Sequence, residues 1–185
     1  LTPVKKHNIV MLGNSLTERG LWGEYFQPAY VLNRGIDGDC VSGMIARLET
    51  ILSGKPKAMF IMAGTNDLIF WKTSYEKLLE QYERMLDIIA RESPRTKVYI
   101  QSLLPLVEDR QDYFKGKNKR IAGFNAVLRE MAERRNLPYI DIWSAIQNNG
   151  ALPEEFTHDG IHLTGPGYAV WVETLRPYMK PYMKK

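Results

Sequence analysis

Short, nearly continuous hydrophobic runs recur along the chain, and longer segments with a helical period separate them. The runs have the length of strands and show little of the polar alternation of a half-exposed sheet. Continuous apolar runs are typical of strands that are buried on both faces, as in a parallel sheet. The predicted strands cover residues 8–12, 30–33, 58–63, 98–104 and 139–142.

Between these runs, hydrophobic residues recur every three or four positions, the period of an amphipathic helix. The predicted helices cover residues 44–52, 75–89, 121–131 and 168–179. Thr73 and Glu76 have the spacing of a capping box at the start of the second helix, and Pro177 and Pro181 are expected to interrupt the last. Strands that alternate with helices predict βαβ crossovers and a three-layer α/β fold with helices on both faces of a parallel sheet.

The bulk properties fit a single folded domain. The chain has 185 residues, 44% of them hydrophobic and 25% charged, and domains usually have about 100–200 residues. No linker or repeat divides it, so we expect residues 1–185 to form one domain. No hydrophobic run approaches the roughly 20 residues that span a bilayer, so no membrane span is expected.

The distribution of charge limits the kinds of partner that the protein can bind, whereas the single cysteine and the first residue do not determine its cellular compartment. The net charge is +4, but the basic residues are dispersed and lack interleaved stacking aromatics, which argues against nucleic-acid binding. The single Cys40 rules out an intrachain disulfide. The chain starts at Leu1 rather than Met, so an exported protein with a signal segment removed before Leu1 stays open, and the compartment is undetermined.

Three polar loops follow the first three predicted strands: residues 13–17 (GNSLT), 33–39 (NRGIDGD) and 64–67 (GTND). The carboxyl ends of parallel strands open on one edge of the sheet, where α/β proteins bind ligands. Taken alone, Ser15 is better explained as a helix cap. The convergence of three such loops instead favours Ser15 as a nucleophile.

A serine nucleophile needs an imidazole base, a carboxylate behind it and donors for an oxyanion. Asp159 and His162 are three residues apart, which one turn of chain can bring together. Gly38 and Asn66 suit oxyanion donors, although glycines in these loops also fit turns and Asn66 also fits a cap. A zinc pair of His158 and His162 is the alternative, but the HExxH glutamate is missing.

Taken together, the blocks GNSL (13–16), GIDGD (35–39), GTND (64–67) and DGIH (159–162) resemble those of the SGNH/GDSL hydrolase superfamily. The GxSxG elbow of ordinary α/β-hydrolases is absent. The resemblance implies a flavodoxin-like sheet of five parallel strands in the order 2-1-3-4-5 and no metal or organic cofactor. It makes Ser15, His162 and Asp159 the catalytic triad, and Gly38, Asn66 and the Ser15 N–H the oxyanion hole. Asn14 departs from the Asp of the commonest motif.

Residues 39–48, GTN (64–66) and HLTGPGY (162–168) resemble the branch of platelet-activating-factor acetylhydrolase catalytic subunits and bacterial carbohydrate or sialate O-acetylesterases. This implies a serine esterase that acts on short acyl groups, acetyl above all, of a small-molecule or carbohydrate substrate. The alternatives are a long-acyl lysophospholipase or thioesterase and a non-catalytic carbohydrate-binding module. Trp71, Tyr113 and Phe114 are candidate substrate contacts; together with Phe70 they could line an acyl groove, stack on a sugar ring or be half-buried loop aromatics. Tyr113 and Phe114 lie in residues 104–117, the longest irregular segment, and loops of that length are often binding loops. The oligomeric state stays open, with a homodimer among the options.

Overall fold

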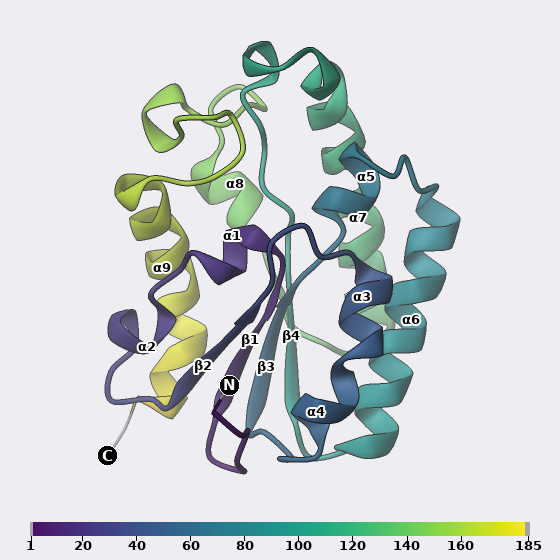
Figure 1. The fold of residues 1–185 in the computed structure, drawn as a ribbon, viewed down its shortest axis with the longest axis vertical. Coiled ribbons are helices and arrows are strands. Elements are labelled where there is room, and N and C mark those ends of the chain that lie inside the picture. The colour runs from purple at the N-terminus through teal and green to yellow at the C-terminus, as the bar shows by residue number, and fades with distance from the viewer. Residues whose placement is uncertain (1, 184–185) are drawn as a thin grey trace.

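The computed structural model of the protein describes residues 2–183 and has a parallel sheet at its centre (Figure 1). The strands are β1 (Ile9–Gly13), β2 (Val31–Gly35), β3 (Ala58–Met62), β4 (Lys97–Gln101) and β5 (Tyr139–Ile140). They form one five-stranded sheet in the order β2-β1-β3-β4-β5, and every neighbouring pair is parallel. The predicted α/β class, strand count and strand order are therefore confirmed.

Burial explains why the continuous hydrophobic runs form the middle of the sheet. Every residue of β1 and β3 is buried, as expected for strands that helices cover on both sides. The edge strand β2 has partly exposed residues, since it has only one neighbour in the sheet. The two strands that carry the nucleophile and asparagine loops thus lie side by side at the rigid centre of the sheet.

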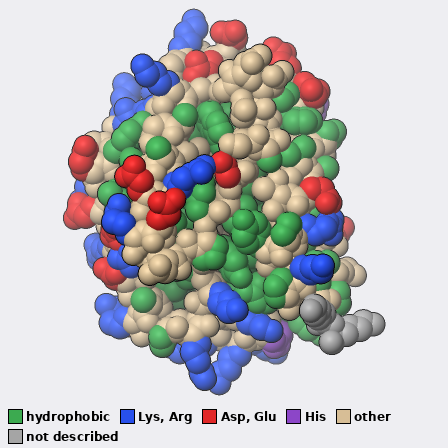
Figure 2. Space-filling model, turned by 180° about the vertical axis from the view of Figure 1, so that it is seen from behind, with side chains coloured by type: hydrophobic (Ala, Val, Ile, Leu, Met, Phe, Trp, Pro, Cys, Tyr) green, Lys and Arg blue, Asp and Glu red, His purple; other side chains and the backbone are tan. Residues whose placement is uncertain are grey.

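Nine α-helical segments lie in the described part of the chain: α1 (Ser15–Glu18), α2 (Trp22–Tyr25), α3 (Val41–Ala46), α4 (Leu48–Leu52), α5 (Thr65–Ile69), α6 (Tyr75–Glu92), α7 (Lys117–Arg134), α8 (Ile142–Ile146) and α9 (Gly165–Met179). Figure 1 shows α2 and α9 on one side of the sheet and α3, α4 and α6 on the other. Right-handed crossovers explain this division. The chain moves from β1 to β2 toward one edge of the sheet and then from β2 to β3 and onward toward the other edge, so the connecting helices lie on opposite faces. Acidic and basic side chains are interspersed over the surface in Figure 2. No helix within residues 2–183 is long and apolar enough to cross a membrane.

Two predicted strands are shorter than expected. The run 98–104 leaves the sheet after Gln101, because the Asn125 side chain hydrogen bonds the main-chain N–H and C=O of Leu103 at 2.8 and 3.0 Å. An amide that serves both groups of one residue replaces the missing strand partner. The predicted strand 139–142 ends at Ile140, because the Asp141 side chain accepts the Ser144 N–H and caps α8.

Three predicted helix details were wrong. The stripe 44–52 is not one helix but α3 and α4, which are separated at Arg47. Ser74, not Thr73, caps α6, since its side chain accepts the Lys77 N–H at 3.2 Å. Pro177 lies inside α9 rather than interrupting it. Both Pro177 and Glu173 are exposed, so water can hydrate the carbonyl that loses its helical partner.

Candidate active site

Ser15 is the first residue of α1, two positions after the last residue of β1. Its predicted alternative role as a helix cap is taken by Asn14, whose side-chain oxygen accepts the Leu16 N–H at 3.1 Å. Capping leaves the Ser15 hydroxyl free for other contacts. It also accounts for the departure at position 14, because the Asn and Asp side chains cap helices about equally well.

The Ser15 hydroxyl lies next to His162, although the two residues are 147 positions apart in sequence. The distance between Ser15 Oγ and His162 Nε2 is 3.0 Å. The other ring nitrogen, Nδ1, lies 2.6 Å from Asp159 Oδ2. Serine, histidine and aspartate therefore form one continuous hydrogen-bond chain, the arrangement that can activate a serine hydroxyl.

The second carboxylate oxygen of Asp159 is held by the turn that carries it. Oδ1 accepts the main-chain N–H groups of Ile161 at 3.0 Å and His162 at 2.8 Å. Burial raises the pKa of Asp159, but the hydrogen bonds from His162 and Ile161 outweigh burial and hold the pKa well below its ordinary value. Asp159 is therefore ionised at neutral pH, as a partner for an imidazolium must be.

The C-terminal segment is fixed against α1 by a buried hydrogen bond. Tyr168, near the start of α9, donates its hydroxyl to the Leu16 carbonyl at 2.7 Å. Gly160 turns the chain between Asp159 and His162 with a φ of 94°, a conformation that other residues rarely adopt. These two features place the histidine on the side of the sheet where Ser15 emerges.

Candidate oxyanion donors flank Ser15 from two loops. Gly38 has a φ of 70° and no heavy atom within 4 Å of the position of a Cβ atom, so its backbone faces open space. The side-chain nitrogen of Asn66 donates to the Asp39 carbonyl at 2.8 Å. An amide nitrogen carries two protons, so this bond orients the Asn66 amide and leaves the second N–H available. Within residues 2–183, the main-chain N–H groups of Ser15 and Gly38 donate to no other group.

These groups meet in one small cavity of about 260 Å³. It is lined by Ser15, Asp37, Gly38, Asn66, Phe70, Gln111, Tyr113, Phe114, Asp159, Ile161 and His162. The predicted site residues thus converge on one cavity, with the exception of Trp71. The loops after β1, β2, β3 and β4 and the segment before α9 all contribute.

The predicted substrate contacts lie at different depths. Tyr113 and Phe70 are each 52% exposed, and their rings lie 5.7 Å apart at the cavity wall. Phe114 reaches the cavity but is almost fully buried behind Tyr113. Trp71 is 71% exposed and does not line the cavity.

Sequence reasoning did not single out Asp37, Gln111 or Ile161 as cavity residues. Asp37 and Ile161 lie inside the glycine and D-x-x-H blocks, and Gln111 lies in the irregular segment 104–117 that was expected to bind substrate. The four blocks and the segment 104–117 contain every residue that lines the cavity except Phe70. The direction in which each side chain points came only from the tertiary structure.

The alternative of a zinc pair does not fit the geometry. The segment with His158 and His162 contains no helix, and both ring nitrogens of His162 are engaged by Ser15 and Asp159. Across residues 2–183, no three His, Cys, Asp or Glu side chains are grouped to hold a metal ion.

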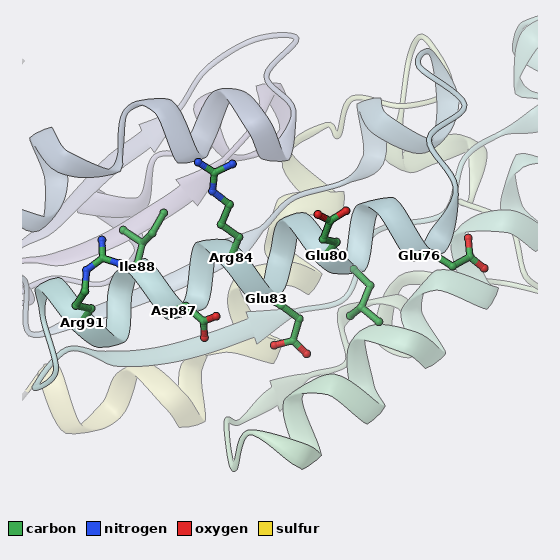
Figure 3. A pocket seen from close by; sticks show the side chains of 8 residues that line it. Glu76, Glu80, Glu83, Arg84, Asp87, Ile88 and Arg91 are labelled. Carbon is green, nitrogen blue, oxygen red and sulfur yellow. The ribbon is translucent and has the colours of Figure 1, made fainter.

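A larger hollow of about 840 Å³ lies along α6 (Figure 3). Its lining is Glu76, Leu79, Glu80, Glu83, Arg84, Asp87, Ile88 and Arg91. All eight residues come from this single helix. It contains none of the four sequence blocks.

Comparisons with known proteins indicate the family of this chain. A family model described as the GDSL-like Lipase/Acylhydrolase family matches residues 11–170. The platelet-activating factor acetylhydrolase IB subunit alpha2 of Rattus norvegicus is 27% identical over 173 residues, covering 89% of this chain and 72% of the relative.

Solved structures share the fold. A protein from Streptococcus pneumonia, provisionally described as a platelet activating factor, superposes with a TM-score of 0.87 at 26% identity over 97% of this chain and 86% of its own. An acetylxylan esterase from Geobacillus stearothermophilus, solved as a catalytic mutant, superposes with a TM-score of 0.73 at 19% identity over 95% of each chain. Because the family model spans more than half of the sequence and all four blocks overlap it, the chain belongs to the GDSL-like lipase/acylhydrolase family and is a carboxylic ester hydrolase.

Proposed function

We propose that this esterase removes short acyl groups, acetyl above all, from neutral carbohydrates, with Ser15 as nucleophile, His162 as base and Asp159 as the orienting carboxylate. The observation that carries the proposal is the hydrogen-bond chain from Ser15 Oγ through the His162 ring to Asp159, with distances of 3.0 and 2.6 Å. The distances are those of a nucleophile and base in reach of each other.

In the first half of the reaction, Ser15 Oγ attacks the ester carbonyl carbon while His162 Nε2 takes the hydroxyl proton. The oxyanion that forms is stabilised by the N–H groups of Ser15 and Gly38 and the free N–H of Asn66. The tetrahedral intermediate then collapses, and the alcohol leaves with the proton that His162 returns to it. The acyl group remains bonded to Ser15.

In the second half, water attacks the acyl-enzyme and loses a proton to His162, which passes it to Ser15 as the carboxylic acid is released. The ionised Asp159 stabilises the imidazolium in both halves. No group outside the chain is needed for the proton transfers. The main-chain N–H donors that are free of other partners support this reading, because they need no rearrangement before the oxyanion forms.

The size of the cavity favours a short acyl group. Its volume of about 260 Å³ lies below the roughly 300–1,000 Å³ of sites that enclose drug-sized ligands. Ile161 and Phe114, both buried, are among the apolar residues that line the cavity. The similarity to an acetylhydrolase and to the fold of an acetylxylan esterase supports acetyl as the group removed.

The charge and shape of the cavity favour a neutral sugar as the alcohol. Within residues 2–183 no Lys or Arg lines it, whereas the carboxylate of Asp37 and the amide of Gln111 do. Carboxylates and amides bind hydroxyl groups, and the exposed rings of Phe70 and Tyr113 offer apolar faces to a sugar ring. Asp37 pairs with Arg19 at 3.9 Å, but both side chains are largely exposed, so this pair is weak. The Asp37 carboxylate should therefore still disfavour an anionic sugar.

Labelling with a fluorophosphonate and peptide mapping tests the nucleophile. We expect the label on Ser15 in the folded protein and none after unfolding, because the free hydroxyl is a poor nucleophile. A folded wild-type protein that stays unlabelled at Ser15 and is inactive on activated acetates would overturn the assignment and favour the non-catalytic binding module.

A series of p-nitrophenyl esters tests the acyl length. We expect kcat/KM to be highest for acetate and to fall as the chain lengthens, because a cavity of about 260 Å³ leaves little room for a long acyl chain. A maximum at eight carbons or more would reject the short-acyl proposal in favour of a lysophospholipase or thioesterase. Acetate release from acetylated xylan against an acetylated sialic acid then tests the alcohol.

A further inference from the structure

Arg47 and Asp39 form an ion pair next to Gly38 and Asn66, the proposed oxyanion donors. Arg47 contacts Asp39 Oδ2 through Nε at 2.9 Å and through a terminal nitrogen at 2.8 Å. The two side chains are only 18% and 10% exposed. The hydrogen bond from Nε and the ion pair with Asp39 are therefore largely shielded from water.

The same guanidinium reaches the nucleophile strand. A terminal nitrogen of Arg47 donates to the Gly13 carbonyl at 3.2 Å, and Gly13 is the last residue of β1, two positions before Ser15. The main-chain carbonyl of Asp39 accepts the Asn66 amide at 2.8 Å. Arg47 thus links the nucleophile block, the glycine block and, through Asp39, the asparagine block.

The local sequence makes room for this contact. Asp39, Gly43 and Arg47 follow one another at intervals of four residues. A Cβ atom on Gly43 would lie 2.0 Å from Asp39 Oδ1, so only glycine leaves space for that carboxylate. Oδ1 in turn accepts the Cys40 N–H at 3.0 Å. Arg47 itself sits at the break between α3 and α4, from which its side chain reaches back to the loop.

We propose that Arg47 is a positioning residue for the oxyanion hole: through Asp39 and Gly13 it sets the distance between the Asn66 amide, the Gly38 loop and Ser15. The inference rests on the proposed function, because it takes Gly38 and Asn66 to be the oxyanion donors. Arg47 is not among the residues that line the cavity, so it acts through the groups that it holds. Loss of the Arg47 side chain should raise the free energy of the transition state and leave the affinity for the substrate in the ground state nearly unchanged.

The decisive variants are Arg47→Met and Arg47→Ala, assayed on p-nitrophenyl acetate. We expect Arg47→Met to lower kcat by about 10²-fold, the cost of misplacing catalytic groups by about 1 Å, with KM within about threefold of wild type. Added guanidinium should restore part of the activity of Arg47→Ala. The pH dependence of the remaining activity should match that of wild type, because the triad is intact.

Arg135→Met is the matched control. Arg135 is also a largely buried arginine in an ion pair, with 27% of its side chain exposed, but it pairs with Glu83 and Asp87 and does not line the Ser15 cavity. Its kcat should stay within about threefold of wild type. Equal losses in Arg135→Met and Arg47→Met would show a general effect of removing a paired arginine and would overturn the proposal.

Asp39→Asn provides a variant of nearly unchanged shape should Arg47→Met fail to fold. Its loss in kcat and that of Arg47→Met should combine less than additively in the double variant, because one contact is lost in both. Full additivity, or a kcat within threefold of wild type in Asp39→Asn, would reject the proposal. A wild-type protein that is inactive and unlabelled at Ser15 would instead reject the proposed function.

Discussion

The cavity beside Ser15 and the hollow along α6 differ in size, in origin and in what their charges do. The α6 hollow is about 840 Å³ and the Ser15 cavity about 260 Å³. The larger one is lined by one helix (Figure 3), and its carboxylates already have partners, as when Glu83 and Asp87 pair with Arg135. The smaller one gathers groups from five segments far apart in sequence. We propose the smaller cavity as the functional site because hydrogen-bond donors from separate segments converge there, not because of its volume.

The largest effect is expected from removing the nucleophile. Ser15→Ala and His162→Ala should each lower kcat by about 10³-fold or more with little change in melting temperature. The matched change at the other hollow is Ser74→Ala, which removes the α6 cap. It should cost about 1 kcal/mol of stability and leave kcat unchanged. Melting curves and p-nitrophenyl acetate turnover measure both, and a variant of Ser15 that keeps most activity would contradict the assignment.

The next largest effect concerns the oxyanion donor from the third loop. Asn66→Ala should lower kcat by about 10²–10³-fold, the usual cost of losing one such donor, with a smaller change in KM. Steady-state kinetics on acetate esters separate the two constants. An effect confined to KM would mean that Asn66 binds substrate without stabilising the oxyanion.

A smaller effect is expected from the charge of Asp37, which lines the Ser15 cavity. Asp37→Lys should shift the ratio of kcat/KM for an acetylated anionic sugar over its neutral counterpart by about fivefold, because reversing a nearby charge changes the interaction by roughly 1 kcal/mol. Added salt should reduce the shift. Asp87→Lys, in the α6 hollow, is the control and should leave the ratio unchanged. Equal shifts in both variants would assign the effect to net charge alone.

A smaller effect should appear in the pH dependence of stability. Burial is the main cause that raises the pKa of Asp67, with the Val41 N–H opposing it and Asp39 adding to it. The folded protein therefore holds this proton to higher pH than the unfolded chain does. The contribution to stability is complete below the ordinary pKa of about 3.9 and is lost as the pH rises through the folded value. Urea unfolding from pH 4 upward should show a flatter dependence in Asp67→Asn, and identical slopes would contradict this origin.

The smallest effect is expected in the larger hollow. Arg84→Gln should change the free energy of unfolding by less than about 0.5 kcal/mol and leave turnover on every ester unchanged, since it alters an open surface. Urea unfolding and the ester series measure it. A clear loss of activity would show that the α6 hollow takes part in function and would break the comparison.

The position of the site could be predicted from the sequence, because the polar loops that form it come directly after hydrophobic runs that predict strands. The continuous run 58–63 predicted a buried strand, and β3 occupies nearly all of it. Each polar loop was expected at a strand end, and the structure brings Ser15, Asp159 and His162 into one hydrogen-bond chain. Strand ends are local features, and parallel pairing then forces them to the same edge.

The sequence failed where a side chain from a distant segment competes with a local preference. The helical period through 44–52 gave no sign of the break at Arg47, which turns back to Asp39 and Gly13. The run 98–104 looked like strand throughout, but Asn125 takes the hydrogen bonds of Leu103. The contacts of Arg47 with Gly13 and of Asn125 with Leu103 have no signature in spacing, because their partners are 34 and 22 residues apart and are brought together only by folding.

By itself, then, the sequence determined the α/β class, the strand order that its family resemblance implies, and the four blocks that surround Ser15. Only the tertiary structure decided that Trp71 stands away from the cavity, that Asp37 and Gln111 face it, and that Arg47 lies behind its loops. The physical reason is that period and turn chemistry act over a few residues. Side-chain direction in a loop depends instead on packing against segments that are remote along the chain.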